Sequence, residues 1–114
     1  MNEKDLLEGA SEKLKNNFSD LVELSEFLEA QYKAKFQRSL PFAELISDRW
    51  SRANKLGFGQ NSSVYDSVLI FGNVIVGKST WIGPFVILDG TGQLTIGDFC
   101  SISSGVQIYT HNTV

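Results

Sequence analysis

An aliphatic residue recurs at every sixth position through the C-terminal half of the chain, and no other feature of the sequence restricts the fold as strongly. An α-helix would bring apolar residues back every three or four positions, and a half-buried strand every two. A period of six fits neither, but it is typical of a solenoid built from hexapeptides. After the fifth member the phase slips by two residues and the repeat resumes. The members are Val64, Ile70, Val76, Ile82, Leu88, Ile96, Ile102, Ile108 and Val114.

The repeat predicts an α+β protein in which residues 59–114 form a left-handed parallel β-helix of about three coils. Each aliphatic side chain would stack on its counterpart one coil away, and hydrogen bonds between coils would form a parallel ladder. The left-handed sense is that of known hexapeptide repeats, and a meander of ordinary strands fits the fixed spacing less well. Gly77, Gly83 and Gly97 are expected at corners that need a positive φ or a close approach of two backbones. A second, mostly small or apolar set is expected to face inward near the corners: Val68, Val74, Thr80, Val86, Leu94, Cys100 and Val106, with Asn112 as the polar exception.

The N-terminal part, residues 1–58, follows the helical period instead and predicts three amphipathic helices, near residues 3–17, 19–36 and 41–57. Ser19 is a candidate N-cap of the second helix, Pro41 suits the start of the third, and Gly57 would end it. The apolar face of the second helix needs a partner, which is either another helix or the repeat. This face comprises Leu21, Leu24, Leu28, Tyr32 and Phe36.

The composition excludes several classes of function. The net charge is −3 without a basic block, so no nucleic-acid partner is expected. No apolar run approaches the roughly 20 residues of a membrane span, and the N-terminus lacks the apolar core of a secretory signal. The single cysteine, Cys100, falls in the inward set, so we interpret it as a packing residue that forms no intramolecular disulfide. A cytoplasmic protein fits these features.

The only histidine, His111, marks the candidate site. The repeat places Thr91 one coil before His111 and Asn73 one coil earlier again, while Asp89 falls in the next column with Phe71 below it and Tyr109 above. The two-residue insertion that breaks the phase lies in the segment LDGTGQL, at the same corner. Repeat proteins tend to carry insertions on their binding face. Asp89 would accept a hydrogen bond from His111 or from a substrate, and in the first case it would fix the imidazole tautomer and raise its basicity.

Plainer interpretations remain open for each of these residues. A lone histidine at a corner is more often solvated than catalytic, and Asp-Gly-Thr-Gly is a good turn sequence in its own right. Trp81 is expected to face outward, where it would stack on a sugar or make a contact between subunits. The candidate substrate-binding residues are Asp89, Tyr109, Asn73 and Trp81.

The segment NVIVGKSTWIGPFVILDGTGQLTIGDFCSISSGVQIYTHNTV resembles the hexapeptide-repeat acyltransferases. It is most similar to the bacterial branch that acylates sugars of surface polysaccharides and lipopolysaccharide, and less similar to maltose and galactoside O-acetyltransferases. The lead-in KLGFGQNSSVYDS resembles the same branch. The likeness covers roughly residues 52–114, about half of the chain, and TWIGPFVILDG and CSISSGVQIYTH are its most specific parts.

The resemblance implies a homotrimer that transfers an acyl group from acetyl-CoA, or another acyl-CoA, to a sugar or sugar-nucleotide acceptor in polysaccharide biosynthesis. The histidine after VQIYT, which is His111 here, would take the proton from the acceptor hydroxyl or amine as it attacks the thioester directly. Backbone N–H groups would stabilise the oxyanion. Asp89 would bind substrate or orient the histidine, and no metal or covalent intermediate is implied.

Two departures from the family keep a second hypothesis open. Family members continue for several more coils, so the resemblance implies that this chain is a fragment or a short form, with an open strand edge that invites pairing. A smaller departure is Asn112, which stands where an aspartate is expected. On the missing coils and the open edge rests the second hypothesis, that the chain is a non-catalytic oligomerisation or scaffold module. A zinc enzyme on the same repeat is disfavoured, because three histidine ligands would be needed and the chain has one.

Overall fold

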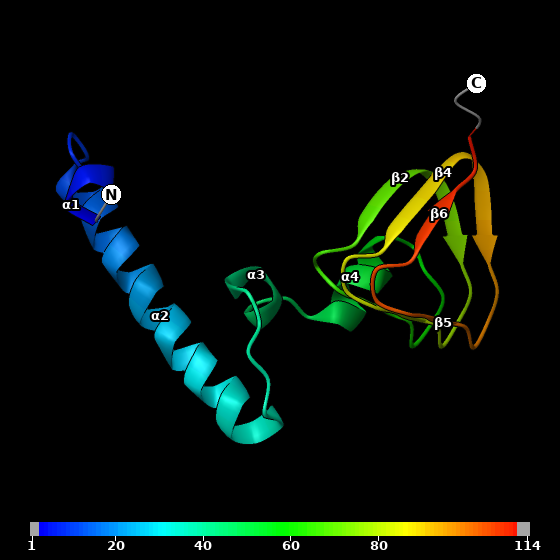
Figure 1. The fold of residues 1–114 in the computed structure, drawn as a ribbon, viewed down its shortest axis with the longest axis horizontal. Helices are drawn as coiled ribbons and strands as arrows, with labels where there is room; N and C mark the ends of the chain where they lie inside the picture. Colours follow the sequence, from blue (N-terminus) through cyan, green and yellow to red (C-terminus); the bar gives the residue numbers. More distant parts are fainter. Residues whose placement is uncertain (1–2, 112–114) are drawn as a thin grey trace. The chain divides into compact units, whose positions relative to one another are not determined.

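The computed structural model describes residues 3–111 (Figure 1). The chain divides into two compact units between Leu45 and Ile46. Each unit is described by itself below. Asn112 and Val114, which the repeat placed in the inward sets, lie outside the described residues. Among the described residues, none of the helices combines the length and the apolar composition that crossing a membrane requires.

The first unit contains α1 (Glu3–Leu6), α2 (Glu12–Phe36) and α3 (Phe42–Leu45). Gly9, with φ +83°, separates α1 from α2, and the hydroxyl of Ser11 caps α2 by accepting a hydrogen bond from the N–H of Leu14 at 3.2 Å. The prediction of a helix start at Ser19 is therefore wrong, because α2 runs through that position without a break. None of the residues of α2 is buried, although it packs against α3.

The second unit begins with α4 (Arg49–Lys55). The carboxylate of Asp48 caps it, with Oδ1 accepting hydrogen bonds from the N–H groups of Trp50 at 3.0 Å and Ser51 at 2.9 Å. This cap divides the third predicted helix into α3 and α4, which belong to different units. Gly57, with φ +78°, lies just past the end of α4, as the sequence predicted.

The described residues of the second unit include six strands, which form two parallel three-stranded sheets (Figure 1). One sheet has the order β1-β3-β5, from β1 (Ser63–Val64), β3 (Trp81–Ile82) and β5 (Ser101–Ile102). The other has the order β2-β4-β6, from β2 (Leu69–Val76), β4 (Ile87–Ile96) and β6 (Gln107–Tyr109). The strands pair in the register of the repeat, with Val64 against Ile82 and Ile82 against Ile102.

The prediction of a left-handed β-helix of three coils is wrong. The described strands form two open sheets, each with two edge strands, and not a closed solenoid. The reason lies in how successive hexapeptides join. In β2 and again in β4, two hexapeptides run on as one strand, with a register shift between Gly72 and Val74. The connections that hold Ser79 and Phe99 have left-handed backbone, with φ 52° and 55°, and are turns rather than strands.

Both sets of residues predicted to face inward contribute to the core, but Ile70, Val74 and Leu94 are only half-buried. The prediction is wrong for Val106, which is 36% exposed. The last strands are less covered, because Ile102 and Ile108 are only half-buried. Cys100 packs against the core as predicted and is also half-buried. Members of these two sets that are at most 1% exposed are Val64, Val68, Thr80, Ile82, Val86 and Leu88.

Two buried hydroxyl groups satisfy backbone groups inside the second unit. Ser62 Oγ donates to the carbonyl of Gly77 at 2.7 Å and accepts from the N–H of Thr80 at 3.0 Å. Thr80 Oγ1 repeats the arrangement, donating to the carbonyl of Gly97 at 2.9 Å and accepting from the N–H of Cys100 at 3.2 Å. Ser62 and Thr80 therefore act as internal caps, which an aliphatic residue would not do.

The glycines predicted at corners are used for close approach rather than for a positive φ. A Cβ on Gly77 would lie 2.1 Å from Asp98 Oδ1, and one on Gly83 would lie 2.7 Å from the ring of Trp81. The expectation is wrong for Gly97, where a Cβ would meet open space and φ is not positive.

Candidate functional site

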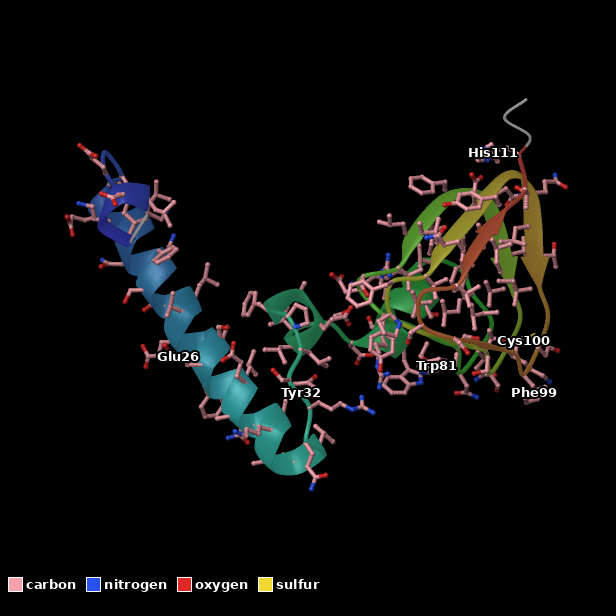
Figure 2. The ribbon with its side chains drawn as sticks, in the orientation of Figure 1. Glu26, Tyr32, Trp81, Phe99, Cys100 and His111 are labelled. Carbon is pink, nitrogen blue, oxygen red and sulfur yellow. The ribbon has the colours of Figure 1, made fainter. Side chains whose placement is uncertain are left out.

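The structure brings Asp89 and His111 together at the C-terminal end of β6, in the β2-β4-β6 sheet. Asp89 lies on β4 and pairs with Tyr109 on β6, and His111 follows Tyr109 by two residues. Asp89 Oδ2 lies 2.5 Å from His111 Nδ1, a short contact of the kind that a charge-assisted hydrogen bond gives. Of the two partners that the sequence left open for Asp89, His111 or a substrate, the structure places His111 against the carboxylate. Figure 2 shows His111 just beyond the C-terminal end of β6, on the side of the second unit away from Trp81.

The two-residue insertion in β4 builds the wall beside this pair. Gly72 pairs with Gly90 and Val74 pairs with Leu94, so the three residues 91–93 lie opposite the single residue Asn73. A Cβ on Gly90 would lie 2.2 Å from the carbonyl oxygen of Asn73. The glycine is therefore required by the packing of the two strands, which an ordinary exposed turn would not demand.

Asp89 is a buried carboxylate with several donors around it. Asp89 as a whole residue is 5% exposed. Oδ1 accepts hydrogen bonds from the hydroxyl of Thr91 and, at 2.9 Å, from the backbone N–H of Thr91. These two bonds, with a smaller contribution from the charge of His111, lower the pKa of Asp89 below its ordinary value of 3.8, although burial acts in the opposite direction. Asp89 is consequently ionised at neutral pH and has no proton to give.

The ionised carboxylate decides which nitrogen of His111 carries the proton. An anion next to Nδ1 accepts a hydrogen bond, so Nδ1 is the donor and the neutral ring keeps its lone pair on Nε2. The side chain of His111 is 39% exposed, and the ring of Tyr109 meets it edge to face with centroids 5.8 Å apart. A neutral imidazole that is held in this tautomer can accept a proton at Nε2 while Asp89 stabilises the cation that forms.

Thr110 ties the inserted residues to the segment that holds His111. Its hydroxyl donates to the backbone carbonyl of Asp89 at 2.7 Å and accepts from the N–H of Gly92 at 2.9 Å. A Cβ on Gly92 would lie 2.3 Å from the carbonyl oxygen of Thr110, so a larger residue would separate the two segments. The sequence interpretation missed Thr110. The only available signal was a hydroxyl residue next to the sole histidine, which is a weak signal because threonine is common in strands.

Two of the predicted substrate-binding residues do not belong to this cluster. Trp81 lies in the other sheet, where its ring meets Tyr65 edge to face with centroids 5.9 Å apart. Asn73 is exposed on β2, opposite the insertion, and its backbone rather than its side chain makes the close contact there. Asp89 and Tyr109 are the two that the structure places beside His111.

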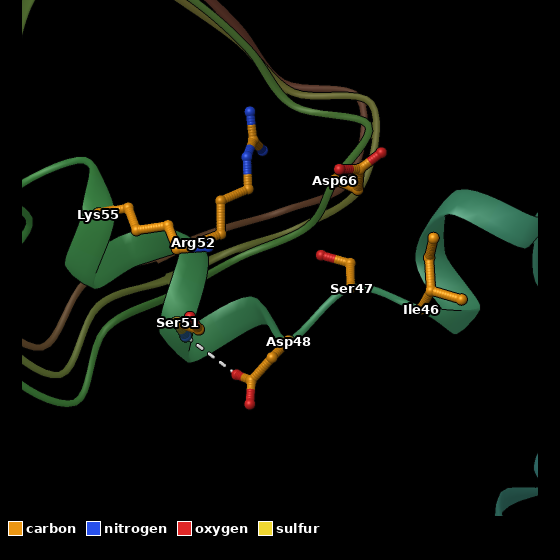
Figure 3. A pocket seen from close by; sticks show the side chains of 7 residues that line it. All are labelled: Ile46, Ser47, Asp48, Ser51, Arg52, Lys55 and Asp66. Carbon is orange, nitrogen blue, oxygen red and sulfur yellow. Dashed lines mark hydrogen bonds between the residues drawn. The ribbon is translucent and has the colours of Figure 1, made fainter.

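A cavity of about 380 Å³ lies elsewhere in the second unit, between α4 and the turn that carries Asp66 (Figure 3). The guanidinium of Arg52 donates to the backbone carbonyls of Tyr65 and Val68, so its donors are engaged in holding that turn to α4. Charges of both signs line the cavity, and it contains no histidine or cysteine. Its lining residues are Ile46, Ser47, Asp48, Ser51, Arg52, Lys55 and Asp66.

Over residues 3–111, no group of three or more histidine, cysteine, aspartate or glutamate side chains could hold a metal ion. Comparison with known proteins adds no family. No family model matches the sequence, and no curated protein matches it either. The geometry of the Asp89–His111 pair therefore has to carry the functional argument together with the sequence resemblance.

Proposed function

We propose that this chain transfers an acyl group from acetyl-CoA, or another acyl-CoA, to a hydroxyl or amine of a sugar or sugar-nucleotide acceptor, with His111 as the general base. The observation that carries the proposal is the 2.5 Å contact between His111 Nδ1 and the buried carboxylate of Asp89. An ionised carboxylate behind a partly exposed imidazole is the arrangement that a histidine general base requires. The sequence resemblance supplies the reaction class, because the pair alone would serve any proton abstraction.

The reaction follows from the tautomer. Nε2 of His111 takes the proton of the acceptor O–H or N–H while the acceptor atom attacks the thioester carbonyl, which gives a tetrahedral oxyanion and an imidazolium that Asp89 stabilises. Collapse of the oxyanion breaks the C–S bond, and the leaving thiolate of coenzyme A takes up the proton that the imidazolium returns. Atoms and charge balance without a metal or a covalent enzyme intermediate. A base of this kind contributes about 10²–10⁴ in rate.

The proposal includes a homotrimer in the cytoplasm. The exposed aromatic side chains at two turns of the second unit support a contact between subunits, since Phe85 is 66% exposed and Phe99 is 73% exposed. Acyl-CoA metabolism and the free thiol of Cys100 fit a reducing compartment.

A non-catalytic oligomerisation module is the second candidate. It is favoured by the outer face of β2, where Leu69, Phe71 and Ile75 are 52%, 48% and 54% exposed. If another subunit covers this apolar face, its exposure is explained without a catalytic role for the chain. Under this hypothesis the Asp89–His111 pair would serve only to fix the end of the sheet.

The experiment that separates the two candidates measures thiol release from acetyl-CoA in the presence of simple sugars, with the wild-type chain and with His111→Asn. The asparagine keeps a polar side chain of similar reach but has no basic nitrogen. We expect a 10²–10⁴-fold loss of the acceptor-dependent rate. Turnover by the wild type that survives in His111→Asn would refute the base role. An oligomer that releases no thiol with any acceptor would favour the second candidate.

A further inference from the structure

Both oxygens of the Asp89 carboxylate are engaged within the protein. Oδ1 accepts two hydrogen bonds from Thr91, from its hydroxyl and its backbone N–H, and Oδ2 faces His111. The side chain of Asp89 is 7% exposed, so a substrate reaches it only through the imidazole. Of the two roles that the sequence left open for Asp89, this enclosure favours orienting the histidine over binding a substrate.

We propose that Thr91 is a positioning residue for His111. Its two hydrogen bonds to Oδ1 rotate the carboxylate so that Oδ2 faces Nδ1, and this keeps the imidazole proton on Nδ1 and the lone pair on Nε2. The inference rests on the proposed function, in which Nε2 is the base, and it adds a residue that acts only through Asp89.

The position of the Thr91 hydroxyl excludes a nucleophilic role for it. Thr91 Oγ1 lies 3.4 Å from Nδ1 of His111, the same ring nitrogen that faces Asp89. In a nucleophile–histidine–carboxylate triad, the hydroxyl and the carboxylate contact different ring nitrogens. The hydroxyl of Thr91 also gives its proton to Asp89 rather than to the ring. Its contribution is therefore to hold the carboxylate.

The insertion is what brings the hydroxyl to this place. Residues 91–93 replace the single residue that the neighbouring strand has, and Thr91 is the first of them. The next residue, Gly92, is anchored through its N–H to the hydroxyl of Thr110. Thr91 is consequently held between two fixed points, Asp89 and Gly92, and its hydroxyl is already directed to Oδ1 in the free protein. This preorganisation is what a positioning residue requires.

The test is the tautomer of His111, measured by long-range ¹H–¹⁵N correlation on the ¹⁵N-labelled full chain at a pH where the ring is neutral. Because His111 is the only histidine, its two nitrogen signals need no further assignment. In the wild type we expect Nδ1 to be protonated and Nε2 to be unprotonated. In Thr91→Val, which removes the hydroxyl at nearly constant shape, we expect the Nδ1–H to Nε2–H ratio to fall about tenfold, the effect of one charge-assisted hydrogen bond.

Two further variants make the result specific. Thr91→Ser keeps the hydroxyl and should restore the wild-type ratio, which loss of packing alone would not predict. Thr95→Val makes the same exchange at an exposed position of the same strand, paired with Ile75, and should leave the ratio unchanged. If Thr91→Val does not fold, Thr91→Ala removes the hydroxyl without adding a methyl group in its place and carries the same expectation.

The outcomes separate this inference from the proposed function. A wild-type ratio in Thr91→Val or Thr91→Ala would overturn the role of Thr91 and leave His111 as the base. A wild type with its proton mainly on Nε2 would overturn both. If the tautomers are as expected but no acyl group is transferred to any acceptor, the proposed reaction would be contradicted. The positioning role of Thr91 would still be supported.

Discussion

Replacing Asp89 with asparagine should abolish most of the proposed catalysis while leaving the shape of the site intact. The asparagine amide has one oxygen and one NH₂ group, and the structure dictates how they are placed. The N–H of Thr91 lies 2.9 Å from Oδ1, so it needs an acceptor there, and the amide oxygen must occupy that position. The NH₂ group then faces Nδ1 of His111, where the carboxylate oxygen was.

The expected loss of kcat follows from this orientation of the amide. A donor in place of the acceptor requires the lone pair of the imidazole at Nδ1, so the ring proton moves to Nε2 and the base is lost at the nitrogen that would face the acceptor. The loss is that of the whole general-base contribution, about 10²–10⁴ in kcat. The corresponding exchange in a serine protease triad costs about 10⁴ for the same reason, a wrong tautomer. KM for the acyl-CoA should stay near its wild-type value, since Asp89 does not contact it in this scheme.

The assay is steady-state thiol release with acyl-CoA and acceptor, run for the wild type, Asp89→Asn and Asp66→Asn. Asp66 is exposed and lies on the turn beside α4, so the control makes the same chemical change away from His111. The ¹⁵N spectrum of His111 should show the proton on Nε2 in Asp89→Asn alone. A kcat of Asp89→Asn within about threefold of the wild type, with the tautomer changed, would refute the catalytic reasoning.

Two further predictions concern stability. Because the pKa of folded Asp89 lies below 3.8, its carboxylate stabilises the folded chain above about pH 4, and this contribution decreases as the pH falls toward the folded-state pKa. In urea unfolding, the destabilisation of Asp89→Asn relative to the wild type should therefore be smaller at acidic pH than at neutral pH. Ile82 is fully buried, and Ile102, which pairs with it, is half-buried. Ile82→Ala should therefore lower the free energy of unfolding by about 2–5 kcal/mol, and Ile102→Ala should lower it clearly less. Equal losses of unfolding free energy at a constant denaturant m-value would contradict this difference in burial.

The six-residue period predicted which segments pair and many of the side chains that enter the core, although Val106 is exposed. Val64, Ile82 and Leu88 are fully buried as predicted, and the stacking of Phe71, Asp89 and Tyr109 appears as strand register. Side-chain direction and register follow directly from a fixed period, because a shift of one residue would turn each apolar side chain to solvent.

The period did not predict whether the repeat closes into a solenoid, nor where the helices begin and end. Whether a hexapeptide becomes a strand or a turn depends on its backbone angles, and the left-handed residues here include Ser79, Phe85 and Phe99, which no propensity rule singles out. Ser11 and Ser19 are equally good N-caps by residue type. The choice depends on where the preceding chain turns, and Gly9 with φ +83° sets that point.

The candidate site lies where the six-residue period is interrupted, so the interruption was more informative about the site than the repeat itself. An uninterrupted period would have given β4 one residue between Gly90 and the next inward position, as β2 has in Asn73. One residue cannot supply a hydroxyl and an N–H to the carboxylate of Asp89 and also an N–H to Thr110. Thr91 and Gly92 together supply all three groups, and the carboxylate that Thr91 holds faces Nδ1 of His111. The sequence located this place by the break in phase. The pairing itself depends on hydrogen bonds that the spacing of residues does not encode.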